Sequence, residues 1–229
     1  GVAYRKPLTR LKETIGILRA LWRGERLVPE MSTLFDARHF KLEMQPLRPD
    51  IPIYVASLQE SAVRAVGRLA DGWVPTFWPY RHLRDGIGML AAGAAEAGRD
   101  VARIEVAPFV AIVPLDDVDL ARGMIKPLVS FYIGGMGAYY HALFCRYGFA
   151  DNANLVRKLF QAGDRARAAA ALSDELIDAI AICGPAQYCR ETLAEWRTYG
   201  VDSALLNLPV GVPPELTEQF LRAIAPSAT

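Results

Sequence analysis

Histidine and cysteine are scarce in this chain, and neither residue type is arranged as a metal site or a disulfide framework. The three histidines stand far apart among 229 residues, and the three cysteines form no Cys-x-x-Cys pair. Structural zinc sites use closely spaced Cys and His ligands, so the sequence predicts no such site. An odd cysteine count argues against a disulfide framework and predicts a reducing, cytoplasmic setting.

Long apolar runs and one-sided charge are also absent. No stretch reaches the roughly 18 uncharged apolar residues that a membrane-spanning helix needs. The 26 Lys and Arg residues and the 25 Asp and Glu residues are interspersed, with a formal net charge of +1. The sequence therefore predicts no membrane partner and no nucleic-acid partner. A hydrophobic fraction of 52% is ordinary for a globular chain with a sizeable core.

What the sequence does contain is an alternation of short apolar segments with helical patterns. An amphipathic pattern predicts a first helix over residues 7–22. Further along, strands are predicted at 53–56, 73–76, 104–113 and 203–208, and helices at 61–69, 80–97, 116–130 and 215–225. Each strand is followed by helix and is apolar on both faces. That pattern is typical of parallel βα units in a sheet covered on both sides, so the fold class is α/β.

Residues 115–180 carry more helical sequence than one connection between parallel strands needs. We interpret them as a helical insertion before the last strand, within a single domain that spans residues 1–229. The Gly-Gly-Met-Gly run that begins at Gly134 lacks the spacing of a dinucleotide-binding fingerprint. It indicates a place where two helices meet or bend. The adjacent Tyr139, Tyr140 and His141 could reach a substrate, but helix packing or a surface position is the favoured interpretation.

The stretch IPIYVASLQESAVRAVGRLADGW, residues 51–73, contains a strand that gives way to a helix through small and polar residues. A helix N-terminus presents free backbone N–H groups and a partial positive charge, which together form a natural anion site. One interpretation is a phosphate cradle built by Ser57, Leu58, Gln59 and Ser61, with Arg64 adding charge. The other is an ordinary helix cap by one of the serines. Both interpretations remain open on these residues alone.

Several segments in the same order and spacing resemble the luciferase-like monooxygenase family. The segments are PLTRLKETIGILRALWRGE, PIYVAS followed by ESAVRAVGRLADGWVPT, FYIGGMGAYYHALFCRYGF, and ICGPAQYCRETLAEWRTYGVDSALLNLP. The resemblance covers nearly the whole chain and is greatest to the branch that uses coenzyme F420. It implies a TIM-type (β/α)8 barrel that binds a flavin or a deazaflavin. It also implies that the turn at Ser57, Leu58, Gln59 and Ser61 holds the cofactor phosphate. Many members have Gly there, where this chain has Leu58 and Gln59.

The resemblance implies an oxidoreductase that transfers hydride between F420 and a small organic substrate. One alternative is a monooxygenase that uses FMN and dioxygen, and another is a non-catalytic half-barrel that binds a ligand or only assembles. Only the second half of the eight-stranded barrel is represented, so the chain is expected to be a fragment or a shortened relative. Its open strand edges predict a homo-oligomer or pairing with a missing N-terminal half.

Three further residues stand where strands end and are candidates for the cofactor site. Trp78 could stack on a flat ring, or simply cover a loop. Thr76 could reach the cofactor, and Asn207 could bind its ring or ribityl chain, or form the turn before Pro209. No Ser-His-Asp or paired-carboxylate constellation is evident, so we assign no catalytic residue. That pattern suits redox chemistry, in which the cofactor carries the reaction and the protein binds and orients it.

Overall fold

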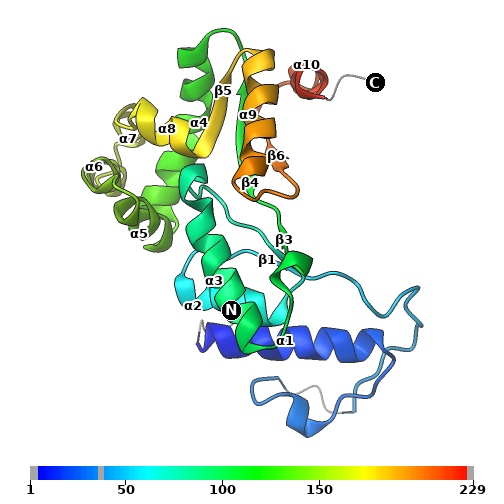
Figure 1. Ribbon diagram of the computed structural model, residues 1–229. Helices are drawn as coiled ribbons and strands as arrows, with labels where there is room; N and C mark the ends of the chain where they lie inside the picture. The colour runs from blue at the N-terminus through cyan, green and yellow to red at the C-terminus, as the bar shows by residue number, and fades with distance from the viewer. Residues whose placement is uncertain (1–4, 36–38, 226–229) are drawn as a thin grey trace. The chain divides into compact units, whose positions relative to one another are not determined.

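A computed structural model describes residues 5–35 and 39–225 of the chain (Figure 1). The chain divides into two compact units. The first comprises Gly1–Val55, Glu60–Trp73 and Gly88–Ile104, and the second comprises Ala56–Gln59, Val74–Ile87 and Glu105–Thr229. Each unit is therefore assembled from segments that are separated in sequence.

The first unit pairs two short parallel strands with three helices. The strands are in register with Tyr54 opposite Gly72 and Val55 opposite Trp73. The elements are α1 (Pro7–Trp22), the 3-10 helix η1 (Pro29–Met31), β1 (Tyr54–Val55), α2 (Glu60–Leu69), β2 (Gly72–Trp73), the part of α3 (Leu83–Glu96) from Gly88 onward, and η3 (Val101–Arg103).

Glycine lets α2 and α3 approach closely in the first unit. A side chain on Gly67 would collide with the backbone carbonyl of Leu90, and one on Gly93 would collide with that of Arg64. Asp71, just before β2, accepts hydrogen bonds from Arg19 at 3.0 Å and from the Ile53 N–H at 2.9 Å. That carboxylate therefore joins α1 to the segments that precede both strands.

The second unit contains a three-stranded parallel sheet in the order β5–β4–β6. Ala111 on β4 is the register point, opposite Ala181 on β5 and Asn207 on β6. The elements are η2 (Tyr80–His82), β3 (Glu105–Val106), β4 (Phe109–Pro114), α4 (Val118–Gly135), α5 (Tyr139–Arg146), α6 (Ala150–Gln161), α7 (Arg165–Ala170), α8 (Asp174–Ile180), β5 (Ala181–Gly184), α9 (Ala186–Thr198), β6 (Leu205–Asn207) and α10 (Pro214–Ile224).

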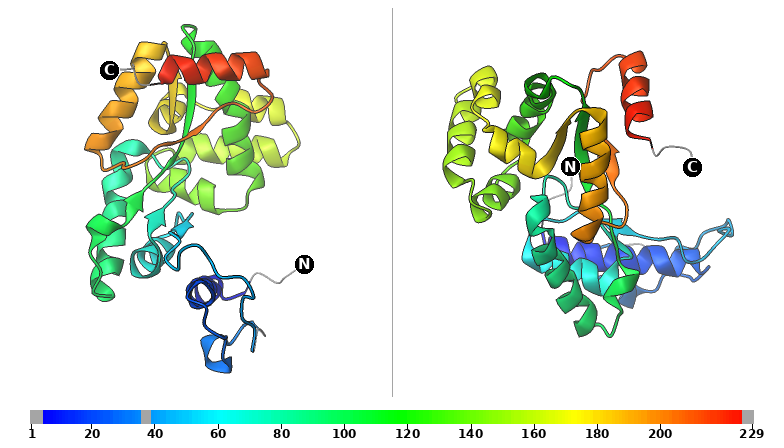
Figure 2. Two further views of the ribbon diagram at one scale, coloured as in Figure 1. Left: turned by 90° about the vertical axis from the view of Figure 1, so that its right-hand side faces the viewer. Right: turned by 45° about the horizontal axis from the view of Figure 1, so that its top comes forward.

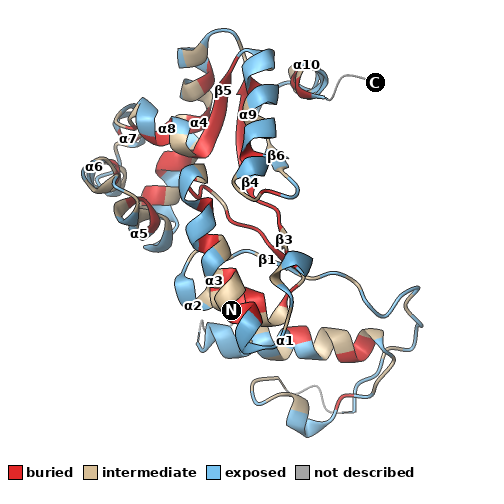
Figure 3. Ribbon diagram, viewed as in Figure 1, coloured by how far each residue is buried: buried red, intermediate tan, exposed pale blue. Residues whose placement is uncertain are grey.

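Helices cover both faces of the β5–β4 strand pair. Helices α4 to α8 gather on one side of β5, and α9 lies on the other (Figures 1 and 2). Both strands are buried almost throughout, as Figure 3 shows. The apolar cluster of this unit is built around α4, whose Ile125, Val129 and Ile133 are at most 1% exposed. This explains why the sequence of these strands is apolar on both faces.

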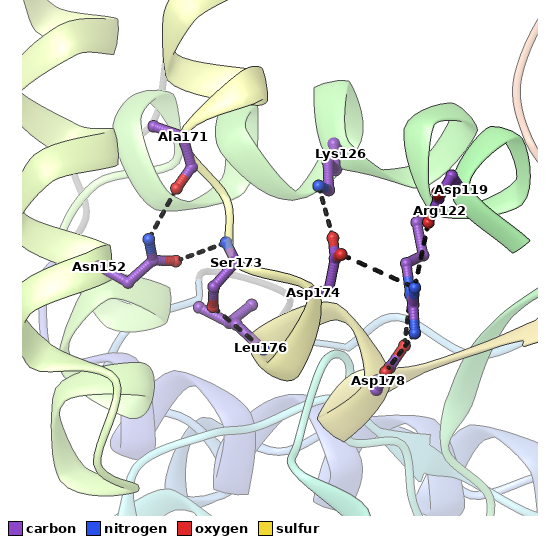
Figure 4. A network of polar contacts seen from close by, with 9 residues as sticks. All are labelled: Asp119, Arg122, Lys126, Asn152, Ala171, Ser173, Asp174, Leu176 and Asp178. Atoms are coloured by element: carbon purple, nitrogen blue, oxygen red, sulfur yellow. Dashed lines mark hydrogen bonds and ion pairs between the residues drawn. The ribbon is translucent and has the colours of Figure 1, made fainter.

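A polar network on the surface holds the helices of the second unit together (Figure 4). Arg122 on α4 makes two hydrogen bonds to Asp178 of α8, and Lys126 bonds Asp174 at 2.7 Å. Nearby, the side-chain amide of Asn152 on α6 donates a hydrogen bond to the Ala171 carbonyl. It accepts one from the backbone N–H of Ser173, the N-cap residue of α8. The Lys126 hydrogen bond lowers the pKa of Asp174. The network thus fixes α8, whose last residue leads directly into β5.

The predicted α/β class with parallel strands is confirmed, and α1 has the predicted bounds of residues 7–22. Strand β5 was missed, because the four residues of Ala181–Gly184 are too few to show a period and directly follow a helix. Gly137, in the predicted helix junction, has φ +79° between α4 and α5. No helix within residues 5–35 and 39–225 is long and apolar enough to cross a membrane.

Candidate functional site

Helix α2 begins at Glu60, so the predicted phosphate cradle lies at a true helix N-terminus. Ser57, Leu58 and Gln59 come directly before the helix, and Ser61 is in its first turn. The first N–H groups of an α-helix have no partner within the helix and point outward along its axis. Gln59 and Ser61 are exposed, whereas Ser57 and Leu58 are half-buried. The local geometry therefore suits an anion approaching the start of the helix.

Charged side chains around this turn are already paired with one another. Glu60 lies 3.7 Å from Arg64, and Arg64 bonds Glu96 at 2.5 Å. The hydrogen bond to Glu96 is the main cause that raises the pKa of Arg64. The interpretation that Arg64 adds charge to the anion site is therefore weakened, because Glu96 and Glu60 already compensate that charge. Backbone N–H groups remain the main attraction for an anion here.

The end of the second strand is buried and aromatic. Thr76 pairs in parallel with Phe109. Trp78 is 4% exposed and packs against Tyr147, with ring centroids 5.7 Å apart. Its indole N–H donates a hydrogen bond to the backbone carbonyl of His82 at 3.0 Å. This burial favours a packing role for Trp78 over contact with a ligand.

Asn207 is the last residue of β6 and is half-buried. Among the described residues, its side-chain amide makes no hydrogen bond, so both its donor and its acceptor remain available. Six of the seven candidate residues lie in the second unit, and Ser61 lies in the first. Most of the predicted site is thus carried by one compact unit.

A cavity of about 550 Å³ opens beside the residues that follow Trp78. Aromatic side chains and two carboxylates contribute to its walls. The lining residues are Pro79, Tyr80, Arg81, His82, Tyr147, Phe149, Glu175, Asp178 and Ala179. None of the seven candidate residues lines it, so the sequence did not predict this cavity.

The thiols of the second unit are suited to packing rather than to chemistry. Burial raises the pKa of Cys183 to about 12 and that of Cys189 to about 11, which keeps both protonated near neutral pH. No cluster of three metal-binding side chains occurs among the described residues. Neither finding supplies a nucleophile or a metal to the site.

Two features near the candidate site were not predicted. The first is the packing of Tyr140 against Phe77, which lie far apart in sequence and whose ring centroids are 6.2 Å apart. The second is the backbone of Phe77, which adopts φ +53° while the residue is 2% exposed. The sequence carries a signal for neither, because a ring contact and a strained backbone angle depend on tertiary packing.

The sequence profile described as Luciferase-like monooxygenase matches residues 1–203 of the chain. A Mycobacterium tuberculosis protein, provisionally named a coenzyme F420-dependent oxidoreductase, is 31% identical over 223 residues. A 5,10-methylenetetrahydromethanopterin reductase of Methanolobus tindarius is 24% identical over 213 residues. The matches cover 88% and 92% of this chain but only 63% and 64% of these relatives. The chain thus spans less than two thirds of their length.

Solved structures share the fold. The coenzyme F420-dependent tetrahydromethanopterin reductase of Methanopyrus kandleri superposes with a TM-score of 0.73 at 20% identity, over 95% of this chain and 62% of that one. A riboflavin lyase with modified FMN superposes with a TM-score of 0.66 at 12% identity, over 97% of this chain and 57% of that one. Deazaflavin-dependent and flavin-associated proteins are therefore both represented among its structural neighbours.

Proposed function

Because this chain belongs to the luciferase-like monooxygenase family, we propose that it acts in hydride transfer between coenzyme F420 and a small organic substrate. The observation that carries this proposal is the 31% identity to a relative provisionally named for F420 chemistry. The local geometry agrees at the helix start, because Gln59 stands directly before the N-terminus of α2.

The residues present fit a cofactor with an anionic tail and a flat, polar ring. Ser57, Leu58, Gln59 and Ser61 would hold the phosphate through backbone N–H groups at the start of α2. The free amide of Asn207 would bond the ring or the ribityl chain. Thr76 offers a hydroxyl, whereas the burial of Trp78 at 4% exposure favours packing over contact with the cofactor.

When bound, the deazaflavin would supply the hydride chemistry. The protein would bind the cofactor, orient it and keep water away from it. Burial of the second strand end supports the last role, since Phe77 and Trp78 are 2% and 4% exposed. No side chain is assigned as proton donor.

We further propose that the chain is one luciferase-like domain forming the second half of a barrel, with residues 115–180 inserted before the last strand. Parallel pairing of β4 with β5, with five helices between them in residues 118–180, supports an insertion, which precedes β5 and so also the last strand β6. Leu205 and Leu206 on edge strand β6 are 38% and 37% exposed, which supports pairing with a further segment or a second copy. Sedimentation velocity at micromolar concentration is expected to detect self-association. A monodisperse monomer would contradict pairing between copies.

An FMN-dependent monooxygenase that uses dioxygen is the second candidate, favoured by the family description and by the structural similarity to the riboflavin lyase. Separate titrations of the purified chain with F420 and with FMN distinguish the two, because each cofactor has its own long-wavelength absorbance. Saturable binding of F420 at lower concentration than FMN supports the proposal, and the reverse order supports the monooxygenase.

A third candidate is a half-barrel that binds a ligand or assembles without catalysis. It is favoured by the coverage of only 63% of the M. tuberculosis relative. If neither cofactor binds saturably to the folded chain, both redox functions are rejected and this candidate stands. Circular dichroism on the same sample confirms that the chain is folded.

A further inference from the structure

The cavity of about 550 Å³ in the second unit contains none of the candidate cofactor residues. Its walls come from the segment that includes η2, from the connection between α5 and α6, and from α8. All of the residues that line it belong to the second unit. Pockets for small molecules typically have volumes of about 300–1,000 Å³, so this cavity is large enough for a ligand of its own.

The aromatic walls of the cavity are held in place by other rings. Tyr147 stacks on the imidazole of His82, with ring centroids 4.4 Å apart at 26°. Tyr80 stacks on Trp196, with centroids 5.1 Å apart at 18°. Because these rings are packed before any ligand arrives, they form a preorganised wall for a flat or apolar group.

Two carboxylates line the cavity, and only one of them lacks a cationic partner. Asp178 accepts two hydrogen bonds from Arg122, at 2.9 and 2.7 Å (Figure 4). Within the described part of the chain, the carboxylate of Glu175 on the same helix makes no ion pair and no hydrogen bond. Glu175 therefore brings an uncompensated negative charge to the cavity.

One arginine lines the cavity, and its hydrogen-bond partner is neutral. The Nε of Arg81 donates to the Tyr80 hydroxyl at 3.2 Å. No ion pair to Arg81 occurs within residues 5–35 and 39–225, and Glu195 acts on it only at longer range. His82, the neighbouring titratable group, already lies 3.4 Å from Asp85. The terminal amino groups of the guanidinium thus remain available, and they suit a carboxylate.

We infer that this cavity binds a small zwitterion with an aromatic or apolar body, the chemistry of an aromatic amino acid. Its carboxylate would pair with Arg81, its ammonium group with Glu175, and its body would lie against the rings. A ligand with only one charge is disfavoured, because an anion is repelled by Glu175 and a cation by Arg81. The inference does not rest on the proposed function, since no candidate cofactor residue lines the cavity.

The first test compares three ligands that share one ring. L-phenylalanine carries both charges, phenethylamine lacks the carboxylate, and phenylpropionate lacks the ammonium group. Each is titrated into the purified full chain by isothermal titration calorimetry. L-phenylalanine is expected to bind saturably. Each of the other two is expected to bind about threefold to tenfold more weakly, because each loses one charge pair at a site that is open to solvent.

The second test removes one charge of the cavity at a time. Glu175→Gln is expected to raise the Kd for L-phenylalanine about threefold to tenfold without weakening phenylpropionate. Arg81→Gln is expected to weaken L-phenylalanine without weakening phenethylamine. Glu215→Gln is the matched control, because Glu215 also stands in the first turn of a helix of the second unit but does not line the cavity. A merely structural role would not produce this crossed dependence on ligand charge.

The inference is overturned if L-phenylalanine does not bind saturably, if the three ligands bind equally, or if Glu175→Gln and Glu215→Gln have equal Kd values for L-phenylalanine. Circular dichroism confirms that each variant is folded. Glu175→Gln is expected to bind F420 as the wild type does, and a changed Kd would overturn the separation of the cavity from the cofactor site. Failure of the wild-type chain to bind F420 would reject the proposed function alone.

Discussion

The connections that follow β1 and β2 each join a parallel strand to a helix, but they do so with different kinds of residues. The first connection, residues 56–59 before α2, is short, polar and largely open to solvent. The second, residues 74–82 after β2, is aromatic and mostly buried, with Phe77 and Trp78 at 2% and 4% exposure. Each connection follows a parallel strand and leads into a helix, yet the two have almost no side-chain chemistry in common.

The difference teaches which kind of site needs tertiary support. The first connection offers backbone N–H groups that exist wherever a helix starts, so its side chains matter little. The second requires Tyr132 and Tyr140 from other helices to hold Phe77 in an unfavourable conformation. Substitutions in the second connection are therefore expected to affect stability, and those in the first to affect ligand binding.

The largest expected effect is on the stability of the second connection. Phe77→Ala is expected to lower the free energy of unfolding by about 3–5 kcal/mol, because it empties a buried site packed against Tyr132 and Tyr140. Denaturant unfolding measures this loss. The control is Phe109→Ala, the same deletion at a side chain that is 43% exposed. Equal losses for the two variants would show that the second connection has no special packing.

Glycine at the same position separates strain from packing. Phe77→Gly is expected to be no less stable than Phe77→Ala, since glycine adopts φ near +53° without the steric penalty that alanine meets. At an ordinary position, glycine would be the worse of the two. Unfolding midpoints that rank glycine clearly below alanine would argue against a left-handed Phe77.

A smaller effect is expected on cofactor affinity at the first connection. Ser57→Asp and the isosteric Gln59→Glu each place a negative charge where the phosphate is proposed to bind. Each is expected to raise the Kd for F420 at least tenfold, about 1.4 kcal/mol. Ser203→Asp adds the same charge before β6 and is the control. Unchanged affinity in both of the first two variants would remove the phosphate from this turn.

Alkaline pH is expected to weaken the second connection and not the first. Burial raises the pKa of Tyr140 and of Tyr147 above the ordinary value near 10. Above that pH the unfolded chain releases these protons while the folded chain keeps them. The free energy of unfolding therefore falls as pH rises. In pH titrations of stability, Tyr140→Phe should show a shallower alkaline decline than wild type; an identical slope would count against a buried Tyr140.

The smallest effect is expected for Gln59→Ala. Gln59 is exposed and, within the described part of the chain, its side chain bonds no other residue, so the free energy of unfolding should change by less than about 0.5 kcal/mol. Because a backbone cradle does not need this amide, F420 affinity should also stay within about threefold. A large drop in affinity would move the contact from the backbone to the Gln59 side chain.

Sequence periodicity predicted much of the fold. Helix α1 has the predicted bounds, and β1 and β6 each lie inside a predicted strand. These elements could be predicted because their apolar spacing and their flanking glycines and prolines are local signals. Strand β5 could not, since four buried residues look alike in a helix and in a strand.

The residues of the candidate site likewise divide into those that local sequence predicts and those that tertiary packing decides. The helix start near Gln59 was predictable from a polar turn after an apolar strand, and its role as an anion site stays a prediction. The availability of Asn207 and the burial of Trp78 depend on what packs around them, which periodicity does not report. The pairing of Arg64 with Glu96 is a further case, because it depends on how the faces of α2 and α3 meet in the folded chain.

By itself, the sequence determined that strands alternate with helices and that a helix begins near Gln59, because hydrophobic period and helix-start chemistry are properties of neighbouring residues. Only the tertiary structure decided that Phe77 would turn left-handed and that Tyr132 and Tyr140 would pack against its ring. Both depend on rings brought together from separate helices, and the packing energy of those rings outweighs the local preference of the backbone.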